Sequence, residues 1–288
     1  MIICIVGPTG VGKTKLSVEL AKKLNAEIIN ADSMQVYRHL NIATAKIREE
    51  EKEGIPHHLF DIVDPTETYT VYDYQRDCRR KIEEISSRGK NIILVGGTGL
   101  YLKAALFDYR FPKEEKKMIE NLSTDELIAR LHRYTDKIEV DCHNQRRLVR
   151  LLERYENGTV EEKKGDRPLY EFKIIGLTLE RDILYQRINQ RVDQMVTEGI
   201  IEEARSFYDK NIHSKALLTG IGYKELYAYF DGNCTLEEAI EKIKQNSRHY
   251  AKRQYTFFNH QFKDIIWLSV NLTHFEQTVE EALDIIRK

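Results

Sequence analysis

The side chains best suited to chemistry stand near the start of the chain, in a glycine-rich loop that carries one lysine and two threonines. The loop reads Gly7-Pro8-Thr9-Gly10-Val11-Gly12-Lys13-Thr14 and fits the pattern G-x-x-x-x-G-K-[ST]. Glycines at this spacing let backbone N–H groups converge on phosphate oxygens, the lysine adds a mobile positive charge, and the last hydroxyl can hold Mg²⁺. The sequence therefore predicts a polyphosphate site at residues 7–14, with Thr14 as a magnesium ligand.

A second polar segment follows the next apolar run. Asp32, Ser33, Met34 and Gln35 come shortly after the run Glu27-Ile28-Ile29-Asn30 and provide a carboxylate, a hydroxyl and an amide within four residues. Such a segment can carry chemistry, but a polar loop after a strand is also typical of a simple helix cap. Both readings stay open from these residues alone.

The third feature is the absence of an acidic residue at the end of the apolar run 91–95. The apolar run 91–95 ends in Gly96-Gly97-Thr98-Gly99, where ATPases and GTPases usually carry an acidic residue that holds magnesium and helps to orient water. Glycines at the carboxyl end of a parallel strand allow a ligand to approach closely. The sequence therefore directs attention to Asp32 as the nearby carboxylate.

These loops need a framework that brings them together. Apolar runs at 2–6, 27–30 and 91–95 alternate with helical patterns at 13–24 and 73–87. Short apolar runs of this kind are typical of strands buried on both faces of a parallel sheet. The sequence predicts an α/β fold, a P-loop NTPase-like parallel sheet with flanking helices.

The strand pattern returns once, at 172–179, and we expect only helices from there to the end. One of these helices should span 182–198, and another should begin at Thr235, whose capping partner is Glu238.

An all-helical insertion domain is expected at 113–170, where apolar runs disappear and charged helical sequence takes over. Ser123 and Glu126 form a capping-box pattern before one helix, and Asn157-Gly158 should end another. The catalytic core would then consist of 1–112 and 171–288.

The composition excludes several classes of protein. With 41% hydrophobic and 32% charged residues the chain is neither disordered nor low in complexity, and its net charge of −1 requires any nucleic-acid or membrane site to be a local patch. The four cysteines form no CxxC pair, which argues against a disulfide framework or a zinc site. No leader or membrane-spanning run is visible, so we expect a cytoplasmic protein with no membrane partner and no obligate protein partner.

Together these blocks resemble the tRNA dimethylallyltransferase (isopentenyltransferase) family, in the bacterial form without a C-terminal zinc finger. The matching blocks are GPTGVGKT, ADSMQVY, GIPHHLFDIVDP, GGTGLY, QRINQRVDQMVTEG (186–199) and AKRQYTFF (251–258). The resemblance spans nearly the whole chain. It implies transfer of a dimethylallyl group from dimethylallyl diphosphate to the exocyclic amine of the adenosine 3′-adjacent to the tRNA anticodon, with release of diphosphate.

The resemblance also implies roles for the polar residues. The loop 7–14 would grip the diphosphate, and Thr9 and Arg191 would stabilise its charge as the allylic C–O bond breaks. Asp32 would accept the proton of the amine, and no water would need to be positioned. Arg187, one helical turn before Arg191, is expected on the surface.

Recognition of tRNA requires local clusters of basic residues. The segment 242–263 contains six Lys or Arg and no acidic residue, and a second basic run lies in the insertion. The residues expected to contact tRNA are Asp32, Ser33, Met34, Gln35, Thr98, Gln145, Arg146, Arg147, Arg150, Arg248, Lys252 and Arg253. Either basic cluster could also be an ordinary solvated helix face. The insertion departs from the family, which usually has Asn-Asp before the arginines where this chain has Asn144-Gln145.

Other functions remain compatible with the motifs. A small-molecule kinase could use Asp32 to bind magnesium or deprotonate a hydroxyl, with the insertion as a lid. An adenylate prenyltransferase would use a free nucleotide as acceptor, and an RNA-binding module that senses a nucleotide would bind without turnover. Adjacent His57 and His58 have no third ligand at a suitable spacing, so we expect a structural role for them and not a metal site.

Overall fold

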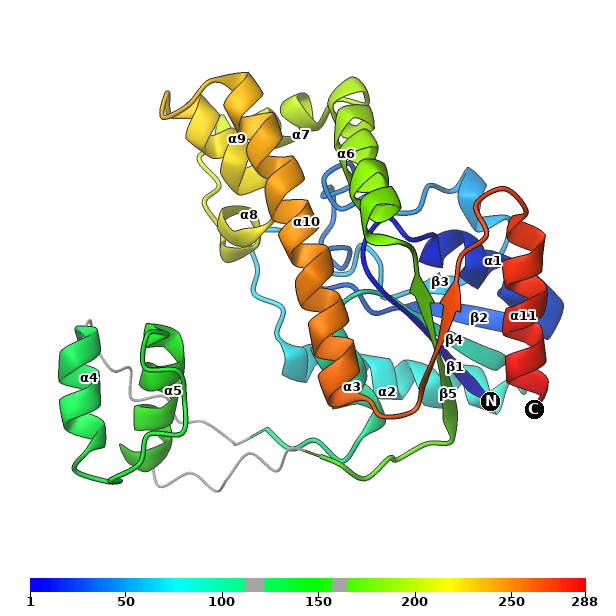
Figure 1. Cartoon of the computed structure of the whole chain (residues 1–288), viewed down its shortest axis with the longest axis horizontal. Coiled ribbons are helices and arrows are strands. Elements are labelled where there is room, and N and C mark those ends of the chain that lie inside the picture. Colours follow the sequence, from blue (N-terminus) through cyan, green and yellow to red (C-terminus); the bar gives the residue numbers. More distant parts are fainter. Residues whose placement is uncertain (112–121, 157–164) are drawn as a thin grey trace. The chain divides into compact units, whose positions relative to one another are not determined.

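The computed structural model describes residues 1–111, 122–156 and 165–288 (Figure 1). Within them the chain divides into two compact units, one formed by Met1–Phe107 with Pro168–Lys288 and the other by Asp108–Arg167. The first unit contains the sheet and most of the helices, and we refer to it as the core. No helix in the described residues is both long enough and apolar enough to cross a membrane.

The core is built on a six-stranded sheet in the order β3-β2-β4-β1-β5-β6, with every neighbouring pair parallel. The strands are β1 (Ile2–Val6), β2 (Ala26–Asn30), β3 (His57–His58), β4 (Asn91–Val95), β5 (Phe172–Thr178) and β6 (Ile265–Ser269). All five residues of β1 and of β2 are buried, as expected for strands covered on both faces. The predicted α/β class and the four predicted strands are confirmed.

The expectation of no strand after residue 179 is wrong. β6 forms the edge of the sheet and pairs with β5, where Gly176 stands beside Trp267. A Cβ on Gly176 would lie 2.5 Å from the Trp267 ring, so the missing side chain leaves room for the indole. This fit joins residues far apart in the sequence, and local pattern alone does not reveal it.

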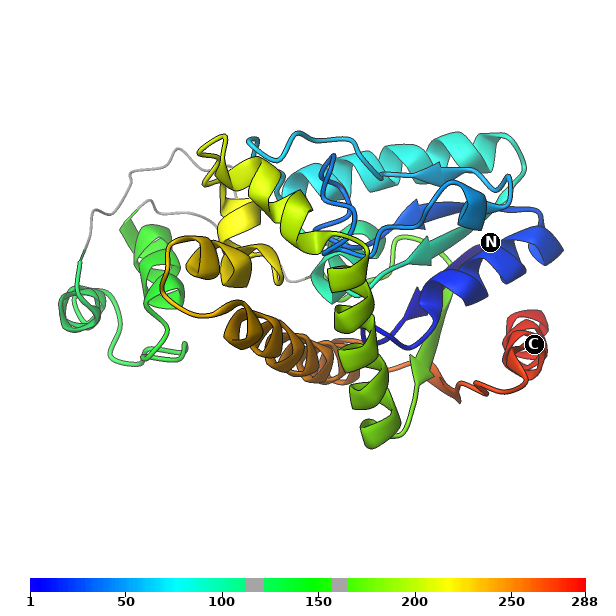
Figure 2. The ribbon, with the colours of Figure 1, turned by 90° about the horizontal axis from the view of Figure 1, so that it is seen from above.

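Helices cover both faces of the sheet (Figure 2). One face packs against α1 (Lys13–Leu24) and α11 (Phe275–Arg287), the other against α2 (Val71–Ser87) and α3 (Gly99–Leu106). The predicted helices at 13–24 and 73–87 are confirmed, the second beginning two residues earlier at Val71. There Thr70 and Asp73 form a capping box.

The remaining helices of the core gather at the carboxyl ends of the strands (Figure 1). They are α6 (Arg181–Thr197), α7 (Ile200–Tyr208), α8 (Lys215–Thr219), α9 (Tyr223–Phe230) and α10 (Leu236–Gln261), with a 3₁₀ turn at Glu50–Lys52 in the loop before β3. The expected helix at 182–198 is confirmed as α6, and the expected cap at Thr235 begins α10. This group places side chains from distant segments around the ends of β1, β2 and β4.

The second unit contains α4 (Thr124–Leu131) and α5 (Gln145–Glu156), which share a small core of four buried leucines. Ser123 and Glu126 form the predicted capping box of α4. The carboxamide of Asn144 accepts the Arg147 N–H at 3.2 Å and so caps α5 despite the departure from the family pattern. The expected helix end at Asn157-Gly158 lies outside the described residues.

Candidate functional site

A cleft of about 1080 Å³ lies at the carboxyl ends of β1, β2 and β4. Its lining includes Lys13 and Thr14 from the first loop, Asp32 from the second and Arg191 from α6. Open parallel sheets bind ligands at this edge because the loops that follow neighbouring strands converge there. Residues as far apart in the sequence as Thr9 and Gln254, which are 245 positions apart, thus share one cavity.

The loop 7–14 is held close to the sheet. Gly7 has φ +136°, and a Cβ at this position would lie 2.5 Å from the Leu177 carbonyl oxygen, so glycine is required twice over. The Lys13 ammonium donates to the Pro8 carbonyl at 2.7 Å. Burial lowers the pKa of Lys13 to about 7, with the charge of Asp32 opposing the shift and that of Arg191 adding to it.

Arg191 reaches the same loop from α6. One guanidinium nitrogen donates to the Thr9 hydroxyl at 3.3 Å, and the other lies 3.5 Å from the Ala45 carbonyl oxygen. Burial lowers the pKa of Arg191 and the nearby Asp32 carboxylate opposes this shift. The structure therefore places Thr9, Lys13 and Arg191 around one position in the cleft, and both cations have lost much of their hydration.

The expected surface position of Arg187 is wrong. Arg187 is half-buried, lines the cleft and donates from Nε to the Gly10 carbonyl at 3.0 Å. Gly10 has φ +82° and lies against Ile188 of the same helix. Arg187 thus fixes the tip of the loop 7–14, because the loop passes directly along the face of α6 that carries both arginines.

On the other side of the cleft, Asp32 is held by a set of short polar contacts. Its N–H donates to the Asn30 carboxamide at 2.9 Å, and its Oδ1 accepts the Met34 N–H at 2.9 Å. Fully buried Asn30 also donates to the Asp32 and Leu59 carbonyls, each at 3.0 Å. Among the residues that the structure describes, none hydrogen-bonds to Oδ2 of Asp32, so that oxygen is available to a ligand in the cleft.

Ser33 and Thr98 are brought together beside this carboxylate. The Thr98 hydroxyl accepts the Ser33 N–H at 3.0 Å and lies 3.3 Å from the Ser33 hydroxyl. Gln35 donates to the Thr44 and Ala45 carbonyls at 3.0 and 3.3 Å, which joins it to the loop that Arg191 contacts.

The sequence suggested that the glycines after β4 leave room for a ligand. In the structure, protein atoms instead occupy the positions where their side chains would lie. A Cβ on Gly96 would lie 2.2 Å from the Ala31 carbonyl, and one on Gly97 would lie 1.9 Å from the Gln254 amide nitrogen. A Cβ on Gly99 would lie 2.3 Å from the Phe257 ring. These positions need glycine because protein atoms, from the loop after β2 and from α10, fill the space.

The structure adds cleft residues that sequence reasoning missed. Gln254 lines the cleft and is buried among the loops. Glu203 does not line the cleft but supports it, because its carboxylate accepts the N–H groups of the lining residues 41–43 at 2.8–3.2 Å. The segment 219–222 also lines the cleft, and Gly220 lies against the Met34 methyl group. The G-x-G spacing at 220–222 is a signal that could have found this segment, whereas an isolated glutamate or glutamine carries none.

The three basic residues expected to bind RNA on α10 have three different surroundings. Arg253 lines the cleft, with its guanidinium 5.7 Å from the Tyr250 ring centroid. Arg248 donates to the Asn189 carboxamide at 2.6 Å and lies 3.3 Å from the Glu241 carboxylate, so α6 and α10 already occupy it.

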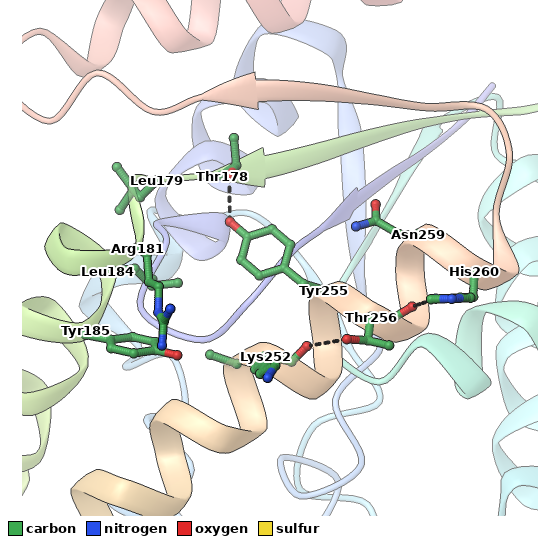
Figure 3. Close-up of a pocket in the computed structure, with 11 residues that line it drawn as sticks. Thr178, Leu179, Arg181, Leu184, Tyr185, Lys252, Tyr255, Thr256, Asn259 and His260 are labelled. Carbon is green, nitrogen blue, oxygen red and sulfur yellow. Dashed lines mark hydrogen bonds between the residues drawn. The ribbon is translucent and has the colours of Figure 1, made fainter.

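Lys252 lines a separate pocket of about 400 Å³ between α10, the end of β5 and the start of α6 (Figure 3). Arg181 and Tyr185 lie across this pocket from Lys252, with the Arg181 guanidinium over the Tyr185 ring. Lys252 therefore does not share the cleft of Asp32.

The basic run of the insertion lies on the exposed part of α5. Arg146, Arg147 and Arg150 are exposed, and no ion pair of theirs occurs among the described residues. The Gln145 amide donates to the Leu122 carbonyl at 2.8 Å, which ties the start of α5 to the segment before α4.

The described residues contain no group of three or more His, Cys, Asp or Glu that could hold a metal. The adjacent histidines make other contacts: His58 lies 2.7 Å from the Glu27 carboxylate and His57 lies 2.7 Å from the Ile55 carbonyl. Exposed Thr14 offers one hard oxygen in the cleft, which suits a magnesium ion held mainly by phosphate oxygens and water.

Comparison with known proteins agrees with this geometry. The model of the family described as IPP transferase matches residues 35–261. The tRNA dimethylallyltransferase of Geobacillus kaustophilus is 47% identical over 97% of this chain and 94% of its own length, and that of Anoxybacillus flavithermus is 49% identical over 99% and 96%.

Solved structures agree as well. The full-length tRNA isopentenylpyrophosphate transferase of Bacillus halodurans has a TM-score of 0.78 at 43% identity, covering 99% of this chain and 95% of its own. A eukaryotic dimethylallyltransferase described as acting on tRNA has a TM-score of 0.84 at 31% identity, covering 99% of this chain and 77% of its own. The chain belongs to the IPP transferase family.

Proposed function

We propose that this protein transfers a dimethylallyl group from dimethylallyl diphosphate to the exocyclic amine of the adenosine 3′-adjacent to the tRNA anticodon, and releases diphosphate. One observation carries the proposal: a single cleft has desolvated cations on one side and an available carboxylate oxygen on the other. Membership of the IPP transferase family supports the same reaction.

The cationic side acts on the leaving group. As the allylic C–O bond breaks, its electron pair goes to the bridging oxygen of the diphosphate. Lys13 and Arg191 stand where they can stabilise this charge, and the Thr9 hydroxyl is a further donor. Because these groups are already held in place with little hydration, they need little reorganisation when the charge develops.

The carboxylate side acts on the acceptor. The adenine amine forms a C–N bond to the allylic carbon and must lose one proton. Asp32 can take it at Oδ2, since Oδ1 is held by the Met34 N–H. Glu51, Glu53 and Glu198 also line the cleft, but Asp32 is the carboxylate with the largest charge effect on both Lys13 and Arg191.

A magnesium ion bound in the cleft would supply positive charge that offsets the charge on the leaving diphosphate. Thr14 is the protein group we assign to it, with the remaining ligands supplied by diphosphate and water. This assignment rests on the place of Thr14 in the lining of the cleft at the start of α1, the position that this loop pattern reserves for the ion.

For the tRNA we assign Arg253 and Tyr250 at the cleft, and Arg146, Arg147 and Arg150 on the insertion. Exposed arginines without an ion-pair partner can neutralise backbone phosphates, and an aromatic ring beside a cation can stack on an unpaired base. All four cysteines are free thiols, which suits the reducing cytoplasm where we propose the reaction takes place.

The test is to incubate the protein with magnesium and labelled dimethylallyl diphosphate together with bulk tRNA, AMP or ATP in separate reactions. Nucleoside analysis of the tRNA should find the label on one adenosine beside the anticodon. Label on AMP or ATP alone would identify an adenylate prenyltransferase. Transfer of the terminal phosphoryl group of ATP to a small molecule, with no prenyl transfer, would identify a kinase.

A further inference from the structure

A buried amide on α10 connects the two sides of the cleft. Gln254 is 4% exposed, and both polar atoms of its side chain are used. Its Oε1 accepts the Thr9 N–H at 2.9 Å, and its Nε2 donates to the Gly97 carbonyl at 3.1 Å. Thr9 belongs to the phosphate-binding loop, whereas Gly97 belongs to the loop after β4.

The contact with Gly97 extends to the carboxylate side. Thr98, the next residue, accepts the Ser33 N–H, and Ser33 directly follows Asp32. Gly97 must lack a side chain for this arrangement, since a Cβ there would lie 1.9 Å from Nε2 of Gln254. One amide is therefore joined directly to the loop of Lys13 and, through a single further hydrogen bond, to the loop of Asp32.

The helix that carries Gln254 is itself anchored elsewhere. Figure 3 shows the neighbouring Tyr255 directed toward Thr178 at the end of β5, where the two hydroxyls lie 2.6 Å apart. Phe257 and Phe258 pack against Gly99 at the start of α3. The amide thus projects from a fixed support and not from a mobile surface.

We propose that Gln254 is a positioning residue that sets the distance between the leaving group and the acceptor amine. The proposal rests on the prenyl transfer proposed above. The Thr9 N–H is directed to Gln254, so Thr9 acts on the diphosphate side through its hydroxyl alone. Transfer between two bound reactants depends steeply on their separation, and an error of about 1 Å can cost about 10²-fold in rate.

Replacing the amide by an acid gives a variant that can be switched by pH. In Gln254→Glu the ionised side chain offers two acceptors, so one oxygen still accepts the Thr9 N–H while the other opposes the Gly97 carbonyl oxygen. The protonated acid has one donor and one acceptor and can make both original bonds. Burial and the adjacent carbonyl favour the neutral form, so this carboxyl should titrate well above the usual range for glutamate.

The experiment measures single-turnover transfer to tRNA at saturating dimethylallyl diphosphate, from about pH 5.5 to about pH 8.5, as a ratio to the wild-type rate at each pH. Gln254→Glu should be about 10²-fold slow at high pH and recover toward the wild-type rate as the pH falls. KM for each substrate should stay within about threefold of wild type, because the side chains assigned to contact the diphosphate and the tRNA are unchanged.

Two variants keep the test decisive. Tyr255→Phe removes a half-buried hydroxyl contact from the same helix and should lower the melting temperature while its rate ratio stays constant with pH. Gly97→Ala places a methyl group where the Gln254 amide nitrogen lies and so disturbs the same contact from the loop after β4. Its transfer rate should be as low as that of Gln254→Glu at high pH and should not recover at low pH. It remains available if the glutamate variant does not fold.

Three outcomes would overturn the positioning role. They are a pH-independent ratio in folded Gln254→Glu, a loss confined to KM, or a normal rate in Gly97→Ala. Failure of the proposed function would look different, because the wild-type protein itself would then transfer no prenyl group to tRNA.

Discussion

The two sides of the cleft hold charge in opposite ways. On the side where we propose that the diphosphate binds, burial disfavours the charged forms of Lys13 and Arg191. The carboxylate that most offsets this burial, Asp32, belongs to the side where we propose that the acceptor binds. On the acceptor side, Asp32 is held by hydrogen bonds from its own loop. An incoming diphosphate therefore restores charge partners to the cations, while the carboxylate is oriented before any substrate arrives. The cations of the first side would therefore be stabilised most when the anion binds, whereas the carboxylate of the second side is already in a fixed orientation.

The largest effect should come from the acceptor side. Asp32→Asn keeps an oxygen for the Met34 N–H but cannot take a proton, so the transfer rate should fall about 10²–10⁴-fold. Diphosphate affinity should be retained. Because Asp32 opposes the lowering of the Lys13 pKa, this affinity is best compared near pH 6, where the lysine stays protonated. Transfer at the wild-type rate would exclude Asp32 as the base.

Removing a cation from the diphosphate side should have a smaller effect. Arg191→Ala should cost about 2–4 kcal/mol of charge stabilisation, which corresponds to about 30- to 10³-fold in transfer rate at saturating tRNA. Its tRNA affinity should barely change, as measured by filter binding. If the variant instead lost tRNA binding and kept its rate, Arg191 would be an RNA contact, and the division of the cleft into two sides would fail.

The pH dependence of diphosphate binding distinguishes the sides further. Below about pH 7 Lys13 is already protonated, whereas above it the lysine must take up a proton when the anion binds. Affinity for inorganic diphosphate should therefore weaken by up to about tenfold per pH unit above pH 7. In Lys13→Arg the diphosphate affinity should fall less steeply with rising pH, because a guanidinium stays charged. Calorimetric titrations of both proteins would check this, and parallel pH profiles would contradict it.

The smallest effect concerns RNA binding at the edge of the cleft. Arg253→Gln should flatten the dependence of log tRNA affinity on log salt by about 0.7–0.9, the contribution of one phosphate contact. Arg248→Gln is the matched control on the same helix. It should leave the slope unchanged and lower stability by about 1 kcal/mol, because Arg248 is already bonded to Asn189. Equal flattening in both variants would show that RNA binding displaces the Arg248 contacts.

Much of the core and part of the site could be predicted from sequence because they are local. The loop 7–14 is contiguous, so its spacing alone predicts a phosphate site between a buried strand and a helix, and both of these elements are present. The position of Asp32 follows from the end of β2, and the capping boxes at Ser123 and Thr235 place two helix starts. Each of these signals is complete within about ten residues.

Tertiary structure alone decided what each helix face meets. Helical periodicity groups Arg187 with Arg191, yet only packing of α6 along the loop directs Arg187 to the Gly10 carbonyl. Packing likewise directs Arg248 to Asn189 and Lys252 to a separate pocket, and it pairs β6 with β5 through Trp267 and Gly176. Gln254 lies 245 residues from Thr9, and no local pattern relates them. Sequence spacing determines which residues share a face, whereas burial and hydrogen bonding across the fold determine what that face binds.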